Sequence, residues 1–418
     1  MKRVHLLKPP EKSKFNFGSF SLAVLAAALE DIAEVRITDA TAMGMDEAVR
    51  QAVMGSPDLV GITVMGTTSV RPVIELIRAL RSAGFSGTVI TGGHGATMFP
   101  VPILEGGADA VVLGEGERTV RDIVRNGISA RVNGICFTEN GTVVRTTPRE
   151  LIDPLDQLRP PARHLIPPPP DGVFLLETSR GCPHGCTFCE TTRFYGRRWR
   201  ARTPELVVHD IRALAEAGAQ MIQIADDNFT ADPRRAIRVC ELLSGGPLPL
   251  FMIFFARSDD LVRVPELSMH LAAAHFLRVS VGVETTDPAL GNVTKKEIPF
   301  EKHKKAFSLL ADAGIFSIAS LIIGLPGETA EMREGYVEKV VELGADAVYF
   351  LPFLPLPGTP LGTRDGEPDP AMVDEAALLT AAFENHPAVR TRMEALAREP
   401  TVRGMLARAS IHRRKSKR

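Results

Sequence analysis

The sequence predicts an α/β protein with two successive parallel sheets: a doubly wound, Rossmann-like sheet, then a partial (β/α)6 barrel and a short helical C-terminal extension. Two observations lead to this fold class. Short runs rich in Val, Ile and Leu alternate with amphipathic stretches, which is typical of parallel sheets covered by helices. A proline-rich stretch divides this alternation into two series, and a chain of 418 residues has room for two or three domains.

The first series predicts a doubly wound domain over residues 1–130. Its expected strands are 4–7, 35–38, 59–64, 88–91 and 110–113, and its expected helices are 21–30, 45–54, 72–83 and 117–125. Glycines follow the last three strands, at Gly66, Gly92, Gly93, Gly114 and Gly116. Ligands of such sheets bind beyond the carboxyl ends of the strands, so these glycines favour a backbone-lined ligand site. The alternative is that each glycine only makes a tight turn.

Residues 131–171 predict a hairpin followed by a linker. Residues 133–145 have the pattern of a small hairpin, with Asn140 and Gly141 as its turn. Prolines then crowd at 160–161 and 167–170, a density that neither a helix nor a central strand tolerates. We therefore expect a semi-rigid connection between the two domains.

The second series predicts a partial barrel over residues 172–363. The expected strands are 173–178, 221–225, 251–255, 277–283, 317–323 and 347–351, and the expected helices are 204–217, 233–243, 264–274, 300–313 and 329–343. Active residues of such barrels lie at the carboxyl ends of the strands. Residues 364–418 have a helical pattern with a basic tail at 412–418, and such ends are usually solvated.

Composition excludes several classes of protein. Lys and Arg total 49 against 50 Asp and Glu, so net charge provides no general attraction to nucleic acid or to anionic membranes. The longest apolar run, near residues 22–29, is far shorter than the roughly 18 residues of a membrane span. The N-terminus lacks a secretory pattern, and five cysteines do not make a disulfide scaffold. We therefore expect a cytoplasmic protein without a membrane span.

Three of the five cysteines, Cys182, Cys186 and Cys189, lie within eight residues, directly after the first strand of the barrel series. Thiolates are soft ligands that suit zinc or iron–sulfur clusters. A structural zinc site needs four protein ligands, and the nearest fourth candidate, His184, is badly placed inside the same loop. A four-iron cluster held by three cysteines would leave one iron open. Unligated cysteines are the remaining alternative.

With Phe188 before its last cysteine, this cluster resembles the signature of the radical S-adenosylmethionine (SAM) superfamily. The resemblance implies a 4Fe–4S cluster on the three cysteines, with SAM chelated by the open iron. It places Asp226 and Asp227 near the SAM amino group, although an acid after a strand is often only a helix cap. The other implied SAM contacts are Arg257 at the carboxylate, Glu284 at the ribose, Ile323, Gly324 and Leu351 around the adenine, and Phe188 beside the cluster.

The domain before the barrel resembles the cobalamin-binding domain of the cobalamin-dependent radical SAM subgroup. The cobalamin contacts implied by this resemblance follow three strands: Thr63, Gly66, Thr67 and Thr68; Gly92, Gly93 and His94; Gly114, Glu115 and Gly116. Arg71 would approach the lower face of the corrin. Residues 8–18 contain no histidine, so we expect base-off cobalamin without a histidine ligand. The alternatives are a domain that no longer binds cobalamin and, for His94, a plain turn residue.

The resemblance implies a methyltransferase. A 5′-deoxyadenosyl radical would take hydrogen from an unactivated carbon, which would then receive a methyl group from SAM by way of methylcobalamin. The alternative is a non-methylating rearrangement, ring contraction or oxidative cyclisation. Methylthiolation is excluded, because Cys136 is the only cysteine before Cys182 and that chemistry needs three more.

The expected partners are a small-molecule or carrier-bound substrate and an electron donor such as flavodoxin or ferredoxin. The non-enzyme alternative is a module that binds nucleic acid through its arginines and basic tail. An aromatic content of 6% leaves few stacking platforms for bases, and we therefore expect no nucleic acid. The arginines of that alternative are Arg197, Arg198, Arg200 and Arg202.

Overall fold

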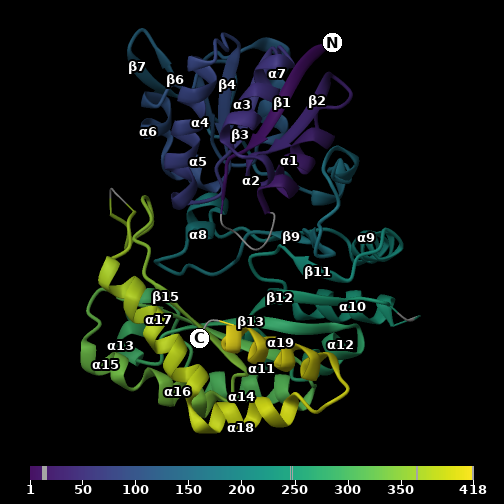
Figure 1. The fold of residues 1–418 in the computed structure, drawn as a ribbon, viewed down its shortest axis with the longest axis vertical. Helices are drawn as coiled ribbons and strands as arrows, with labels where there is room; N and C mark the ends of the chain where they lie inside the picture. The colour runs from purple at the N-terminus through teal and green to yellow at the C-terminus, as the bar shows by residue number, and fades with distance from the viewer. Residues whose placement is uncertain (12–16, 245, 247, 364–365, 417–418) are drawn as a thin grey trace. The chain divides into compact units, whose positions relative to one another are not determined.

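The computed structural model describes residues 1–11, 17–244, 246, 248–363 and 366–416 (Figure 1). It divides into two compact units, Met1–Asp171 and Gly172–Arg418. In the described chain, no helix combines the length and the apolar character that crossing a bilayer requires.

The first unit contains one seven-stranded sheet in the order β2-β1-β3-β4-β5-β6-β7. The first five strands are parallel, as expected, while β6 and β7 are antiparallel. The expected hairpin is therefore part of this sheet, and Asn140 and Gly141 form its turn with φ values of 48° and 77°. The strands are β1 (Lys2–Lys8), β2 (Ala33–Asp39), β3 (Leu59–Thr63), β4 (Thr88–Gly92), β5 (Ala110–Val112), β6 (Ile135–Glu139) and β7 (Thr142–Arg145).

Helices cover both faces of this sheet, which confirms the doubly wound class. Alternate strand residues enter opposite cores: Leu6 packs with the core that contains α1 and α7, and Leu7 packs with the core that contains α3, α4 and α6. The short helices α2, α5 and α6 were not predicted from the sequence. The helices are α1 (Phe17–Ala27), α2 (Ala40–Met43), α3 (Met45–Met54), α4 (Val70–Ser82), α5 (His94–Met98), α6 (Pro100–Glu105) and α7 (Glu117–Asn126).

The second unit contains a six-stranded, all-parallel sheet in the order β15-β14-β13-β12-β11-β8. All six expected strands are present, and a separate two-stranded pair, β9 and β10, follows the first of them. The strands are β8 (Val173–Leu176), β9 (Ser179–Arg180), β10 (Arg200–Ala201), β11 (Met221–Ile224), β12 (Phe251–Arg257), β13 (Phe276–Glu284), β14 (Phe316–Ile323) and β15 (Ala347–Pro352).

One large core joins this sheet to its helices. The expected helix at 329–343 is two helices separated at Gly335, and α8, α11 and α13 were not anticipated. The C-terminal helices contribute Phe383, Met393 and Ala407 to the same core, so the extension is packed on the barrel unit (Figure 1). The helices are α8 (Glu190–Tyr195), α9 (Pro204–Glu216), α10 (Pro233–Leu243), α11 (Ser258–Arg263), α12 (Leu267–Ala273), α13 (Pro288–Thr294), α14 (Phe300–Asp312), α15 (Ala330–Glu334), α16 (Tyr336–Leu343), α17 (Pro370–Asn385), α18 (Pro387–Leu396) and α19 (Val402–Ser416).

Candidate functional site

The cysteine loop, residues 181–189, lies between β9 and α8 in the second unit. It begins at Gly181, whose φ of +84° favours glycine, and a Cβ there would lie 2.0 Å from the carbonyl oxygen of Arg198. It ends at Cys189, which is the N-cap of α8 and donates its N–H to the carbonyl of Cys186 at 3.3 Å. The loop is therefore tightly constrained at its start and turned back on itself at its end.

Two carboxylates at the end of β11 hold this loop in place. Asp227 accepts hydrogen bonds from the Gly181 N–H at 3.0 Å and from the Thr191 hydroxyl at 2.6 Å, which flank the loop. Asp226 is 1% exposed and accepts from the Thr178 N–H and from the hydroxyls of Thr178 and Ser179. Neither acid caps a helix. Both position the strand-to-loop segment, and a SAM contact for them stays a prediction.

Thr187, inside the loop, connects it to two distant segments. Its N–H donates to the carbonyl of Thr294 at 3.0 Å, and its hydroxyl donates to the carbonyl of Val293 at 2.7 Å. Its own carbonyl accepts the N–H of Leu361 at 3.3 Å. The cysteine loop is thus bonded both to the end of α13 and to the segment after β15.

The donor set of the loop fits an iron–sulfur cluster with three thiolate ligands. Cys186 is buried, Cys182 and Cys189 are half-buried, and burial raises the pKa of the Cys189 thiol to about 11. The Arg257 Nη1 donates to the Cys186 sulfur at 3.7 Å, so a guanidinium directly contacts one of the three thiols. Across the described residues, no three His, Cys, Asp or Glu side chains group around a single ion position.

Arg257, at the end of β12, already has an anionic partner. Its Nε and Nη2 donate to the two carboxylate oxygens of Asp259, each at 3.0 Å. Burial opposes both charges, but this bidentate pair outweighs it, raising the pKa of Arg257 and lowering that of Asp259. Sequence reasoning missed Asp259. Arg257 is placed beside the cysteine loop, and its SAM carboxylate contact stays a prediction.

Glu284, the expected ribose-binding acid, lies at the end of β13 in a buried ion pair. Its Oε1 accepts from the Lys296 Nζ at 2.7 Å, and both side chains are at most 12% exposed. Glu284 has a φ of +63°, where the pairing with β14 shifts register. A Cβ on Gly282 would lie 2.3 Å from that oxygen and 2.5 Å from that nitrogen. Lys296 has no sequence signal that would have identified it.

Strand register decides which expected SAM residues share a face of the sheet. Arg257, Gly282, Ser320 and Tyr349 are successive partners across β12, β13, β14 and β15, so they form one row on one face. Two residues further along β15, Leu351 is on that face and is 46% exposed. Ile323 is fully buried in the helix-side core, so only its backbone is available to SAM on the other side.

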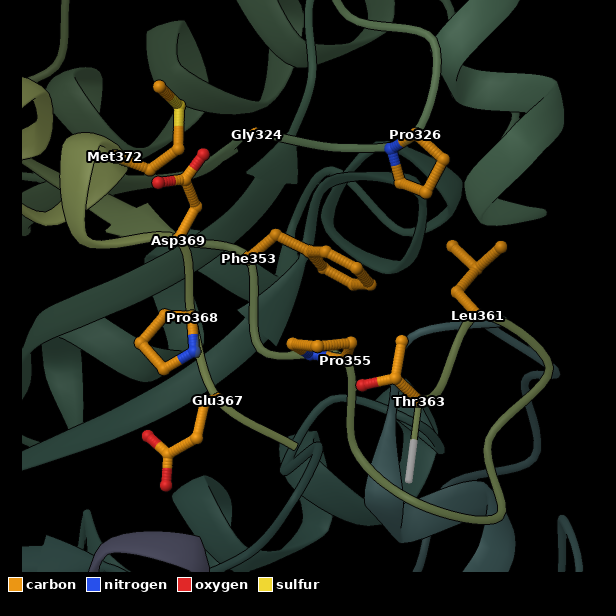
Figure 2. A pocket seen from close by; sticks show the side chains of 10 residues that line it. All are labelled: Gly324, Pro326, Phe353, Pro355, Leu361, Thr363, Glu367, Pro368, Asp369 and Met372. Carbon is orange, nitrogen blue, oxygen red and sulfur yellow. The ribbon is translucent and has the colours of Figure 1, made fainter. Parts of the chain in front are cut away.

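A pocket of about 400 Å³ lies at the carboxyl ends of β14 and β15, a typical volume for a small-molecule site. Gly324, expected at the adenine, lines it. Figure 2 shows the Phe353 ring between Pro326 and Pro355. Phe353 and Phe188 of the cysteine loop both pack against one small buried cluster, which consists of Leu290, Ile322 and Leu325. The remaining lining residues are Leu361, Thr363, Glu367, Pro368, Asp369 and Met372.

The expected cobalamin residues follow β3, β4 and β5, which are neighbours in the sheet of the first unit. A Cβ on Gly66 or Gly114 would meet no atom within 4 Å, so both backbones border open space. A Cβ on Gly93, by contrast, would lie 2.7 Å from the Val64 carbonyl oxygen, so the backbones are closely packed there. Thr97, which sequence reasoning missed, donates to Gly93 and accepts from Gly114. This edge is open where a flat ligand can approach, which fits a corrin.

The remaining expected residues of this edge have varied surroundings. Thr63 is buried and its hydroxyl lies 3.3 Å from that of Ser21, while Thr67 and Thr68 start the turn before α4. Arg71 is 90% exposed and pairs with Glu75. His94 begins α5 and Gly116 precedes α7. Glu115 is buried and accepts the Ile152 N–H at 2.6 Å, which ties it to the linker.

Both units match protein-family models. Residues 176–340 match the radical SAM superfamily, and residues 11–124 match the B12 binding domain. In structure, 87% of the chain superposes on 77% of the radical SAM methyltransferase TsrM from Kitasatospora setae, solved with cobalamin and a 4Fe-4S cluster bound, with a TM-score of 0.76 and 25% identity.

The chain belongs to the cobalamin-dependent radical SAM enzymes.

Two curated relatives of this radical SAM enzyme differ in their named roles. An uncharacterized methyltransferase of Pyrococcus horikoshii is 29% identical over 383 residues, which are 86% of this chain and 82% of the relative. The anaerobic magnesium-protoporphyrin IX monomethyl ester cyclase of Rubrivivax gelatinosus is 28% identical over 328 residues, which are 74% of this chain but only 59% of the cyclase. The cofactors of this family are a 4Fe–4S cluster, SAM and cobalamin.

Proposed function

We propose that this protein is a cobalamin-dependent radical SAM methyltransferase that methylates an unactivated carbon. The observation that carries the proposal is that this chain superposes on a radical SAM methyltransferase over most of both lengths. The three-cysteine loop held by Asp227 and the open, glycine-lined edge of the B12 unit agree with it. When bound, the cluster and SAM supply the hydrogen-abstracting radical, and cobalamin supplies the methyl group.

The residues of the chain position these groups. Asp226, Asp227 and Thr187 hold the backbone of the loop that carries the three thiols. On the neighbouring sheet face, Arg257 and Glu284 would meet the polar ends of SAM, with Leu351 and the backbone around Gly324 beside its adenine. The half-buried Asp259 and the buried Lys296 hold those two side chains in fixed orientations.

Cobalamin would bind base-off at the edge formed by Gly66, Gly92, Gly93 and Gly114. The loop after β1, where a cobalt-ligating histidine would be placed, has no histidine, and its residues 12–16 lie outside the described chain. Its first residue, Lys8, is buried and pairs with Asp39 at 3.1 Å and with Glu11 at 3.2 Å. With no imidazole from this loop, the lower face of the cobalt would carry no histidine ligand.

A second candidate function is non-methylating cyclisation. The similarity to a magnesium-protoporphyrin ester cyclase over 74% of this chain favours it. The two functions differ in the fate of the SAM methyl group, because only a methyltransferase moves it to the substrate.

Three measurements test the proposal. Anaerobic reconstitution should give about four irons per chain, and a variant with Cys182, Cys186 and Cys189 changed to Ala should bind none. Incubation with hydroxocobalamin and desalting should leave a corrin spectrum. With methyl-deuterated SAM, product from a library of candidate substrates should carry the label. A protein that keeps its iron in the triple variant, or that stays colourless after cobalamin, contradicts the proposal.

A cytoplasmic location and a flavodoxin or ferredoxin electron donor complete the proposal. Cluster reduction requires an electron from outside the chain. Reduced flavodoxin or reduced ferredoxin should therefore bleach the cluster absorption of the reconstituted protein. If neither does, the proposed electron donor is wrong.

A further inference from the structure

The barrel sheet has one face packed by helices and one face that stays partly exposed. Parallel sheets are usually buried on both faces. Here Phe255 is 39% exposed and Tyr349 is 43% exposed, and their register partners place both on the face opposite the helix-side core. Large apolar side chains left exposed together mark a binding surface. This is the face that also carries Arg257 and Leu351.

Arg278 brings a positive charge to the same face. It precedes Ser280 and Gly282 by two and four residues on β13, so all three point to one side. Its Nη2 donates to the Tyr349 hydroxyl oxygen at 3.2 Å, and the guanidinium therefore extends across β14 to β15. Among the described residues, Arg278 forms no ion pair, and this hydrogen bond is its one polar contact.

Two other charged residues at this end of the sheet, Arg257 and Glu284, already have partners of opposite charge. Arg257 is in a bidentate pair with Asp259, and Glu284 is paired with Lys296. Arg278, by contrast, has no carboxylate partner among the described residues. Because Tyr349 accepts from Arg278, its own hydroxyl hydrogen is still available to donate. A guanidinium and a phenol next to each other are matched to a planar anion, above all a carboxylate.

We propose that the substrate carries a carboxylate on an apolar, ring-containing body, bound by Arg278 and Tyr349 with the body against Phe255. This inference rests on the proposed function, and it names the substrate class of the same site. Phe255 pairs with Ser280 across the sheet, one row from Arg257, so a substrate held there lies beside the expected SAM residues. The SAM carboxylate is the rival anion, and the experiment separates the two sources.

The test measures charge discrimination with two probes of the same shape. The full chain, reconstituted with iron, sulfide and cobalamin and saturated with SAM, is titrated with 1-naphthoate and with neutral 1-naphthamide by saturation-transfer NMR. Naphthoate should bind about tenfold more tightly than naphthamide. Arg278→Gln should abolish the preference, Tyr349→Phe should reduce it, and Arg278→Lys should retain part of it. Arg238→Gln, on the helix α10 with a half-exposed side chain, should leave it unchanged.

Two outcomes overturn the inference. One is a native protein without preference for naphthoate. The other is a preference that survives Arg278→Gln; if that variant also loses affinity for SAM, Arg278 is assigned to the SAM carboxylate. Iron content and circular dichroism check that each variant is folded. The binding preference does not depend on methyl transfer, so failure of the proposed function would appear separately, in the labelling experiment.

Discussion

The two units expose comparable edges, the carboxyl ends of parallel strands, but they organise them differently. In the second unit, side chains brace the edge: Asp226, Asp227 and Thr187 hold the cysteine loop through hydrogen bonds from several segments. In the first unit, backbone shape dominates, because glycines such as Gly66 and Gly114 leave open space beside the strands.

This difference follows from what each edge has to hold. Three thiolates must be placed individually around a compact cluster, which needs a rigid loop with its conformation supported by a second layer of contacts. A broad, flat macrocycle instead needs a surface without protruding side chains. The comparison therefore predicts that matched substitutions have larger structural effects in the second unit than in the first.

The largest effect is expected from a methyl group added to a glycine. Gly181→Ala places a Cβ 2.0 Å from the Arg198 carbonyl oxygen, whereas Gly114→Ala meets no atom within 4 Å. Both glycines have positive φ, so Gly114→Ala should lower the free energy of unfolding by about 1 kcal/mol. Gly181→Ala should lower it by about 4 kcal/mol, and the reconstituted variant should lose most of its iron. Thermal unfolding and iron analysis measure both. Equal losses in the two variants would break the comparison.

Removal of a buried lysine should have the next largest effect. Lys296→Met leaves Glu284 buried without its cation, at a cost of about 3 kcal/mol, and should weaken SAM binding measured by equilibrium dialysis. Lys8→Met should cost less, because Asp39 keeps hydrogen bonds from Ser19 and from the Thr41 N–H. Lys296→Arg should recover part of the SAM affinity. A Lys296→Met protein with native SAM affinity would refute a positioning role.

A buried histidine in each unit should make both acid-sensitive. Burial lowers the pKa of His5 to about 4 and that of His303 to about 3. Each is neutral when folded and has its ordinary pKa of about 6.5 when unfolded, so the unfolded chain binds the extra proton below pH 6.5. Stability therefore falls as pH falls, by about 2 kcal/mol per histidine at pH 5, and below pH 4 only His303 adds further loss.

Hydrogen–deuterium exchange read separately from β1 and α14 peptides measures this acid response in each unit. His5→Gln should flatten the dependence for β1 alone, and His303→Gln for α14 alone. An unchanged pH dependence in either variant would contradict the assignment for that unit.

Most of the fold could be predicted because long amphipathic segments reveal their period. The helices α3 and α10 have the bounds expected from sequence, and all eleven parallel strands are present. The short helices were missed, since four to seven residues do not establish a period: α13, for example, has seven residues and starts at Pro288, capped by Asp287. The helix expected at 329–343 is interrupted at Gly335, because glycine has a low helix propensity.

The site was predictable where the family signature names a residue, and not where only contacts define it. Cys182, Cys186 and Cys189 were found from their spacing. Lys296 and Thr187 were missed because their partners are set by tertiary contact: Thr187 bonds to Val293, 106 positions away. For the same reason the three hydrogen bonds that the Asp226 carboxylate accepts within the protein were not predicted, while its contact with SAM stays a prediction.

The smallest effect on stability is expected at Arg71, the exposed counterpart of the buried Arg257. Its side chain is 90% exposed and pairs only across one helical turn with Glu75, so Arg71→Gln should change the free energy of unfolding by less than about 0.5 kcal/mol. If Arg71 approaches the lower face of the corrin, the same substitution should nevertheless shift the absorption spectrum of bound cobalamin. Arg78→Gln, on the exposed side of the same helix, is the matched control. A spectrum that is identical in the native protein and both variants would remove Arg71 from the cobalamin site, and a large loss of stability would show that this edge is braced by side chains after all.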